Sequence, residues 1–103
     1  MDDFSSPDLT NSYGYIPSVE NYIRPKKRPV SSMSPSIIVD NDNNVQLILG
    51  ASGGSKIVSS IVQVAIKSLW MGSDIKSAID DLRIHHQLYP EYLQIESGFS
   101  NVI

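Results

Sequence analysis

The pattern of apolar and polar positions becomes regular near residue 36. Two short β-branched runs, Ser36–Val39 and Val45–Leu49, flank the polar segment Asp40–Asn44. Asp and Asn side chains bond nearby backbone groups and tolerate left-handed backbone angles, so this segment is typical of a turn. The pattern therefore predicts a β-hairpin over Ser36–Leu49.

A longer apolar stretch follows from Lys56 to Met71, and its length favours a helix over a strand. Gly72 is a typical helix stop. A second helix is expected from Asp74 to about Leu82, and a last short strand over Tyr92–Ile95. Within the longer stretch, the apolar residues at helical spacing are Val58, Val62, Ala65, Ile66 and Leu69.

The first third of the chain lacks such periodicity. Five of the six prolines lie between Pro7 and Pro35. Proline removes a backbone donor and keeps the preceding residue out of the helical region. We therefore expect extended loops over residues 1–35, and a hairpin, helices and a final strand over residues 36–103. Strands followed by an apolar helix indicate an α+β fold in a single domain at most.

Composition excludes several classes of protein. The chain has 103 residues, 41% of them hydrophobic, and a net charge of −3. A fully disordered chain is excluded, and nothing attracts nucleic acid in general. The absence of cysteine excludes disulfides, a zinc–cysteine site and a thiol nucleophile. No run approaches the ~20 apolar residues of a membrane span, and the acidic start, Met1–Phe4, is not typical of a signal peptide.

Three polar clusters each have a simple structural alternative. Asp40–Asn44 begins like a calcium loop, but Val45 and Ala51 stand where that loop needs Gly and Glu. Lys26–Arg28 suits nucleic-acid binding or, more simply, a solvated loop. If His85 and His86 lie on a helix, they chelate a metal poorly, because adjacent side chains diverge by about 100°. The simplest role for these histidines is structural hydrogen bonding to nearby carbonyls. A Ser-His-Asp triad remains an open alternative. We expect no metal and no cofactor.

The Gly50–Lys56 segment is similar to a phosphate-binding loop but lacks two of its requirements. Ser55 stands in place of a glycine and Ile57 in place of Ser or Thr. A strand still leads through Gly53 and Gly54 into a helix start. Backbone N–H groups there can face an anion or a developing oxyanion; the alternative is a tight turn.

Five segments together carry a family resemblance: MDDFSSP (1–7), the stretch Pro17–Pro29 with NYIRPKKRP (21–29), SSMSPSIIV (31–39), GASGGSKI (50–57) and RIHHQLYPE (83–91). The chain resembles the small subunit of γ-glutamyltranspeptidase (glutathione hydrolase), an N-terminal-nucleophile hydrolase, over almost its whole length. The resemblance implies a partial αββα sandwich. It also implies an acyl transfer: a threonine exposed by autocatalytic cleavage attacks the γ-glutamyl carbonyl of glutathione, with its own amine as base, and water or an amino-acid or peptide acceptor takes the acyl group.

The resemblance also implies roles for individual residues. Asp3 matches the carboxylate that binds the α-ammonium of the γ-glutamyl group, and Asp2 is a supporting neighbour. Ser31 and Ser32 match the serines that hold the α-carboxylate. A zwitterionic amino acid needs such a combination of one anion and several donors.

The Gly53–Gly54 pair matches the oxyanion hole. The family's nucleophilic threonine lies upstream of the residue that matches Met1, and the large subunit of the same precursor is the implied partner. We therefore expect a fragment that is inactive alone, in a family that is extracellular or anchored to a membrane by an N-terminal segment. The alternatives are a non-catalytic remnant, a partner-binding fragment and an unrelated anion-binding module.

Overall fold

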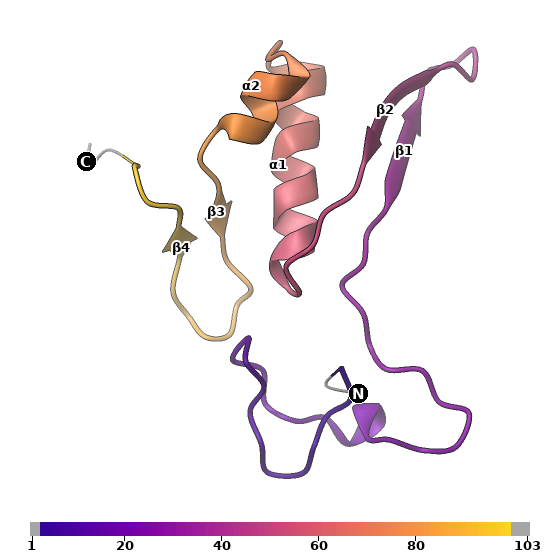
Figure 1. Cartoon of the computed structure of the whole chain (residues 1–103), viewed down its shortest axis with the longest axis vertical. Helices are drawn as coiled ribbons and strands as arrows, with labels where there is room; N and C mark the ends of the chain where they lie inside the picture. The colour runs from indigo at the N-terminus through magenta and orange to yellow at the C-terminus, as the bar shows by residue number, and fades with distance from the viewer. Residues whose placement is uncertain (1–2, 100–103) are drawn as a thin grey trace.

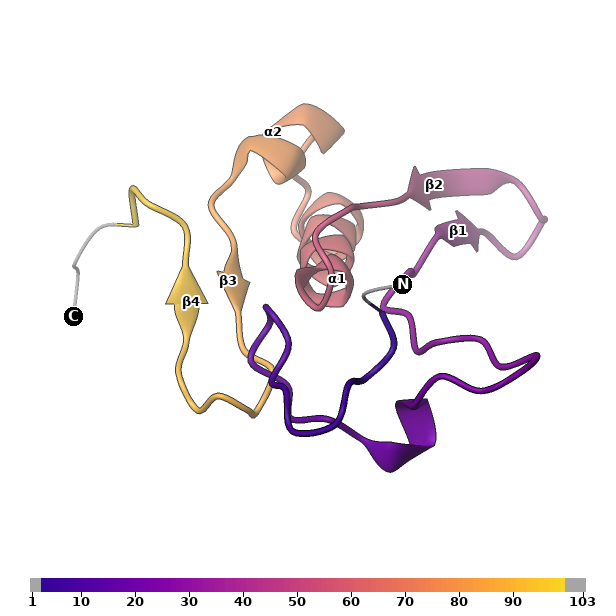
Figure 2. The same ribbon diagram turned by 60° about the horizontal axis from the view of Figure 1, so that its bottom comes forward.

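The computed structural model describes residues 3–99, and its first β-strand begins at residue 36. Figure 1 shows α1 between the β1–β2 hairpin and the β3–β4 pair, with α2 beside its C-terminal end. The loops of the first third lie beyond the N-terminal end of α1, and they come forward in Figure 2. The elements are η1 (Val19–Asn21, a 3-10 turn), β1 (Ser36–Val39), β2 (Val45–Leu49), α1 (Lys56–Trp70), α2 (Ile75–Asp80), β3 (Ile84–His85) and β4 (Gln94–Ile95).

The predicted hairpin is confirmed. Strands β1 and β2 pair antiparallel, with Ile37 opposite Ile48. One Asp40 carboxylate oxygen accepts the N–H groups of Asp42 and Asn44, each at 2.9 Å. The Asn44 backbone N–H is the main cause of the lowered pKa of Asp40, because it favours the charged carboxylate. The segment that begins like a calcium loop is thus a turn closed by its own carboxylate.

Helix α1 is also confirmed, with an end one residue earlier than predicted and Gly72 in the left-handed region at φ +72°. The apolar residues that fall at helical spacing in the sequence are not the ones that α1 buries. Val58 and Val62 are 47% and 48% exposed, whereas the buried residues of α1 are Ile57, Ile61 and Val64. A helix that is apolar on most of its circumference does not reveal from sequence which stripe is packed.

The segment after α1 is less regular than predicted. The N-cap of α2 is Asp74, whose pKa is lowered chiefly by the hydroxyl of Ser77. The helix ends at Asp80 rather than near Leu82. The last strand covers two residues, and its partner β3 was not predicted, so His85 lies in a strand and not on a helix. Strands this short carry too few residues for a period-2 pattern.

The structure is open rather than compact. Its accessible surface is 8189 Å², against roughly 5800 Å² for a folded protein of this mass. The radius of gyration is 16.9 Å, against about 13 Å for a compact domain of this length. No helix within residues 3–99 is long and apolar enough to cross a membrane.

Candidate functional site

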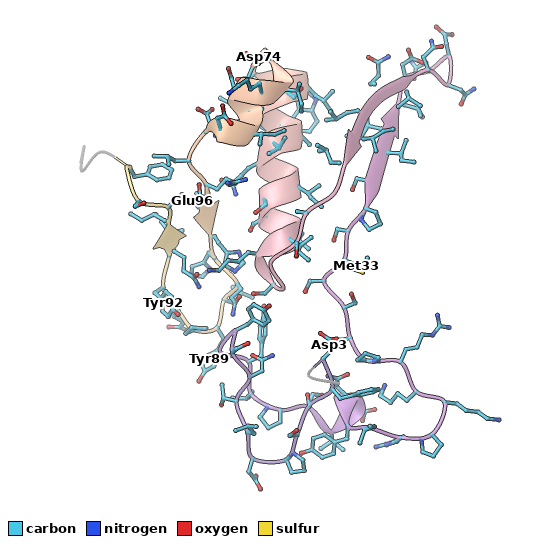
Figure 3. All side chains as sticks on the ribbon, in the orientation of Figure 1. Asp3, Met33, Asp74, Tyr89, Tyr92 and Glu96 are labelled. Carbon is cyan, nitrogen blue, oxygen red and sulfur yellow. The ribbon has the colours of Figure 1, made fainter. Side chains whose placement is uncertain are left out.

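A cavity of about 800 Å³ lies between the N-terminal loops and the first turn of α1. It brings together Asp3, Ser31, Ser32 and Gly54, which are far apart in the sequence. Asp3 is the one charged residue among the described residues that line it. Asp3 and Met33, which also lines the cavity, are labelled in Figure 3 between the loops and the start of α1.

Asp3 is exposed, and its backbone carbonyl is held by the side chain of another residue. The Asn21 side-chain amide donates to the Asp3 carbonyl oxygen at 2.8 Å, a bond that does not involve the Asp3 carboxylate. A second cavity, of about 670 Å³, shares Asp3 with the first. Asp2, the predicted supporting neighbour, lies outside the described residues.

The Ser31–Ser32 pair forms another part of the wall. The Ser31 hydroxyl oxygen accepts the Met33 N–H at 3.1 Å, so its own proton remains available to an acceptor. The Ser32 carbonyl accepts the Ser34 hydroxyl at 3.0 Å. These local bonds stiffen an extended segment that has no ladder partner among residues 3–99.

The Gly53–Gly54 turn adopts backbone angles that favour glycine. Its φ values are +137° and +60°. The Gly53 and Gly54 carbonyls accept the N–H groups of Lys56 and Ile57 and so begin α1, whereas hydrogen bonds among residues 3–99 leave both glycine N–H groups without an acceptor. Free donors at the start of a helix suit an anion or oxyanion. Gly54 lines the cavity, but Gly53 is not among its lining residues.

Tyr13 is a cavity residue that sequence reasoning missed. A Cβ built on Gly54 would lie 2.1 Å from the tyrosine ring, so the bare glycine lets the ring approach. The turn around Tyr13 is organised by the Asn11 side chain, which accepts the Tyr13 and Tyr15 N–H groups. Asn11 and Gly14 indicate a turn, but no sequence signal places the ring against Gly54.

His85 has protein partners on both ring nitrogens. The Gln87 amide donates to the Tyr13 and Tyr89 carbonyls, at 2.7 and 2.8 Å, so its oxygen accepts from His85 Nε2 at 2.9 Å. His85 Nδ1 lies 2.8 Å from the Ser59 hydroxyl oxygen, which also lies 3.1 Å from the Lys56 carbonyl oxygen. Neither Ser59 nor His85 lines either cavity. Within residues 3–99 no three His, Cys, Asp or Glu side chains gather as metal ligands. The geometry fits the structural role expected for this histidine.

Comparison with known proteins decides the family. The family model described as Gamma-glutamyltranspeptidase matches residues 1–103. The chain belongs to the γ-glutamyltranspeptidase family. The resemblance carried by its five segments is therefore confirmed.

Named relatives and solved structures agree with this membership. Over all 103 residues, the chain is 46% identical to glutathione hydrolase proenzyme 2 of Schizosaccharomyces pombe and 50% identical to scoloptoxin SSD14 of Scolopendra dehaani. It spans only 17% and 18% of the length of these proteins, respectively. The crystal structure of the Helicobacter pylori γ-glutamyltranspeptidase T380A mutant superposes with a TM-score of 0.83 at 41% identity, covering 92% of this chain and 51% of that one. The mixed helix and strand content is thus part of a γ-glutamyltranspeptidase fold.

Proposed function

We propose that this chain supplies the γ-glutamyl-binding loops and the oxyanion turn of an enzyme that cleaves the γ-glutamyl bond of glutathione and passes the acyl group to water or to an amino-acid or peptide acceptor. Family membership over residues 1–103 supports the reaction class. The observation that carries the proposal is the shared cavity, because its lining includes Asp3, Ser31, Ser32 and Gly54.

Recognition of the substrate in the ground state falls to the loops. The Asp3 carboxylate pairs with the α-ammonium, and the Ser31 and Ser32 hydroxyls donate to the α-carboxylate. The free proton of Ser31 supports this assignment, because its oxygen already accepts the Met33 N–H. Charge-assisted hydrogen bonds of this kind are stronger and shorter than neutral ones. Asp2 is proposed to support the Asp3 loop.

Stabilisation of the transition state falls to the glycine turn. As the nucleophile attacks, negative charge develops on the γ-carbonyl oxygen, and the N–H groups of Gly53 and Gly54 donate to it. Two observations support this role: these N–H groups have no acceptor among residues 3–99, and Gly54 lines the same cavity as Asp3. Donors held in place before the reaction lower its barrier without reorganising.

The proposed nucleophile is a threonine that lies outside residues 1–103. In the proposed reaction the amine of a threonine takes the hydroxyl proton, the threonine oxygen attacks the γ-carbonyl, and collapse of the oxyanion expels the leaving amine, which takes the proton. Water or the acceptor then attacks the resulting ester. The large subunit of the precursor completes the site, the 103 residues alone are inactive, and together the subunits form the αββα sandwich. No metal or cofactor is needed, and the complete protein faces the cell exterior.

The test uses a protein that we call the complete enzyme. It consists of residues 1–103 with the adjoining coding sequence of their own gene or, where that sequence encodes no threonine segment, residues 1–103 in place of the matching residues of the Schizosaccharomyces pombe proenzyme. The complete enzyme should release the amine from a γ-glutamyl anilide. A correctly processed complete enzyme that leaves the anilide intact would instead favour a non-catalytic or partner-binding fragment.

A further inference from the structure

Asn21 is one of the two buried polar residues among those described. It ends the 3-10 turn η1 and is only 6% exposed. Its amide nitrogen donates to the Asp3 carbonyl at 2.8 Å and to the Ser5 hydroxyl at 3.2 Å. Its amide oxygen accepts the Val30 N–H at 3.0 Å. The side chain therefore uses both its donor and its acceptor ends.

These hydrogen bonds join two loop segments that have few other hydrogen bonds between them. One segment carries Asp3, and the other reaches Ser31 directly after Val30. Among residues 3–99, the bond from Val30 to Asn21 is the one hydrogen bond between residues 23–35 and the loops before them. By contrast, the Asn21 main chain also holds the first segment, since its carbonyl accepts the Ser5 N–H at 3.1 Å. One amide thus sets the distance between the two segments.

We infer that Asn21 is a positioning residue for the γ-glutamyl group, and this inference rests on the proposed function. The α-ammonium and α-carboxylate of the substrate sit on one carbon atom, so the groups that bind them must keep a fixed spacing. Asn21 keeps that spacing by holding the Asp3 backbone with its nitrogen and the residue before Ser31 with its oxygen. The amide carries its donor and its acceptor on separate atoms, whereas the carboxylate of an aspartate only accepts. A displacement of about 1 Å is enough to cost on the order of 100-fold in rate.

The test compares two substrates with the same leaving group. A γ-glutamyl anilide carries both the α-ammonium and the α-carboxylate, whereas a glutaryl anilide keeps the carboxylate and lacks the ammonium. Asn21→Asp retains the size and the acceptor of the side chain but loses the donor to Asp3. In the complete enzyme, this change should lower kcat/KM for the γ-glutamyl anilide by about 10- to 100-fold, mainly through KM. The glutaryl anilide should change by less than about threefold, because a substrate with one anchor does not depend on the spacing.

The chain offers a matched control in Gln63. Its amide also bridges backbone groups, donating to the Ile84 carbonyl at 2.7 Å and accepting the Ile84 N–H at 3.0 Å. It lines neither cavity. Gln63→Ala should therefore affect both anilides in equal proportion, as any purely structural change would.

The outcomes separate failure of this inference from failure of the proposed function. A complete enzyme that does not prefer the γ-glutamyl over the glutaryl anilide contradicts the proposed function, and the inference with it. A wild-type preference that survives Asn21→Asp, or losses that are equal for both substrates, overturns the inference alone. If Asn21→Asp does not fold, Val30→Pro removes the accepted N–H and leaves Asn21 in place. It should reduce the preference in the same direction, and an unchanged preference would overturn the inference.

Discussion

Residues 3–35 and residues 36–99 are each stabilised by a different kind of interaction. The second region is organised by strand pairing and by the packing of α1, whose buried residues are Ile57, Ile61 and Val64. The first region contains one 3-10 turn and buries no apolar residue. Its loops are tied together by side chains, above all by Asn21.

The difference explains why the two regions are assigned different tasks. Loops fixed by a few side-chain bonds can present charged and hydroxyl groups such as Asp3 and Ser31 at chosen positions. A helix start instead presents backbone N–H groups, as at Gly53 and Gly54. Under the proposed function, changes in the loops alter recognition of the γ-glutamyl group, whereas changes in the glycine turn alter the rate of the chemical step.

The largest predicted effect is loss of function when the two regions are separated from the rest of the enzyme. The isolated 103-residue chain should release no product from a γ-glutamyl anilide and should show no cooperative thermal transition. Under the proposed function the attacking threonine amine comes from outside these 103 residues, and the accessible surface of 8189 Å² leaves extensive apolar faces uncovered. Circular dichroism during heating and the anilide assay test both statements. A sharp transition, or product release abolished by Asp3→Ala, would show that the chain functions by itself.

In the complete enzyme, the glycine turn should be the position most sensitive to substitution. Gly54→Val should lower kcat by roughly 150-fold, or about 3 kcal/mol, as for the loss of one oxyanion donor. The new side chain also meets the Tyr13 ring, 2.1 Å from the Cβ position. Gly50→Ala is the matched control, because a Cβ there meets nothing within 4 Å. A rise in KM at constant kcat would make Gly54 a binding or turn residue instead.

Asp3→Ala should act on recognition. Removing one partner of a desolvated ion pair costs roughly 2–5 kcal/mol, so kcat/KM for the γ-glutamyl anilide should fall about 30-fold or more. Asp42→Ala, in the exposed hairpin turn, removes the same charge far from the cavity and should leave the kinetics unchanged. Steady-state kinetics that remain within about threefold of wild type would contradict the role of Asp3.

The two serines should have smaller effects. Ser31→Ala and Ser32→Ala each remove one neutral donor to a carboxylate, worth about 1–2 kcal/mol, or roughly 5- to 30-fold in kcat/KM. Ser97→Ala, at an exposed turn, is the control. If both serine variants match the wild type, another part of the cavity wall must bind the α-carboxylate.

The sequence predicts the regular region better than the loops. The hairpin follows from Asp40–Asn44 between β-branched runs, and α1 follows from the length of its apolar stretch. The sequence does not predict which stripe of α1 is buried, because both stripes are apolar. Tertiary packing determines that Ile57 is buried and Val58 is exposed. A strand as short as β3 depends on a partner strand elsewhere in the chain, since Ile84 pairs with Ile95 and His85 pairs with Gln94.

Some residues of the candidate site could likewise be predicted from the sequence, and others could not. The Gly53–Gly54 turn has a physical signal in the sequence, a strand leading through glycines into a helix. Asp3 and the serines are recognisable only through the family resemblance, since isolated Asp and Ser residues in a loop carry no signal. Tyr13 and Asn21 have roles that depend on contacts between distant loops, and no local pattern reveals them.

The most direct test of the division between recognition and rate is the preference of the complete enzyme for a γ-glutamyl over a glutaryl anilide, measured as a ratio of kcat/KM values. Asp3→Ala should reduce this ratio by about 30-fold, because only the γ-glutamyl substrate has an ammonium to lose. Gly54→Val should lower kcat for both substrates and leave the ratio within about threefold of wild type, because both form the same oxyanion. An unchanged ratio in Asp3→Ala, or a ratio that collapses in Gly54→Val, would contradict the account.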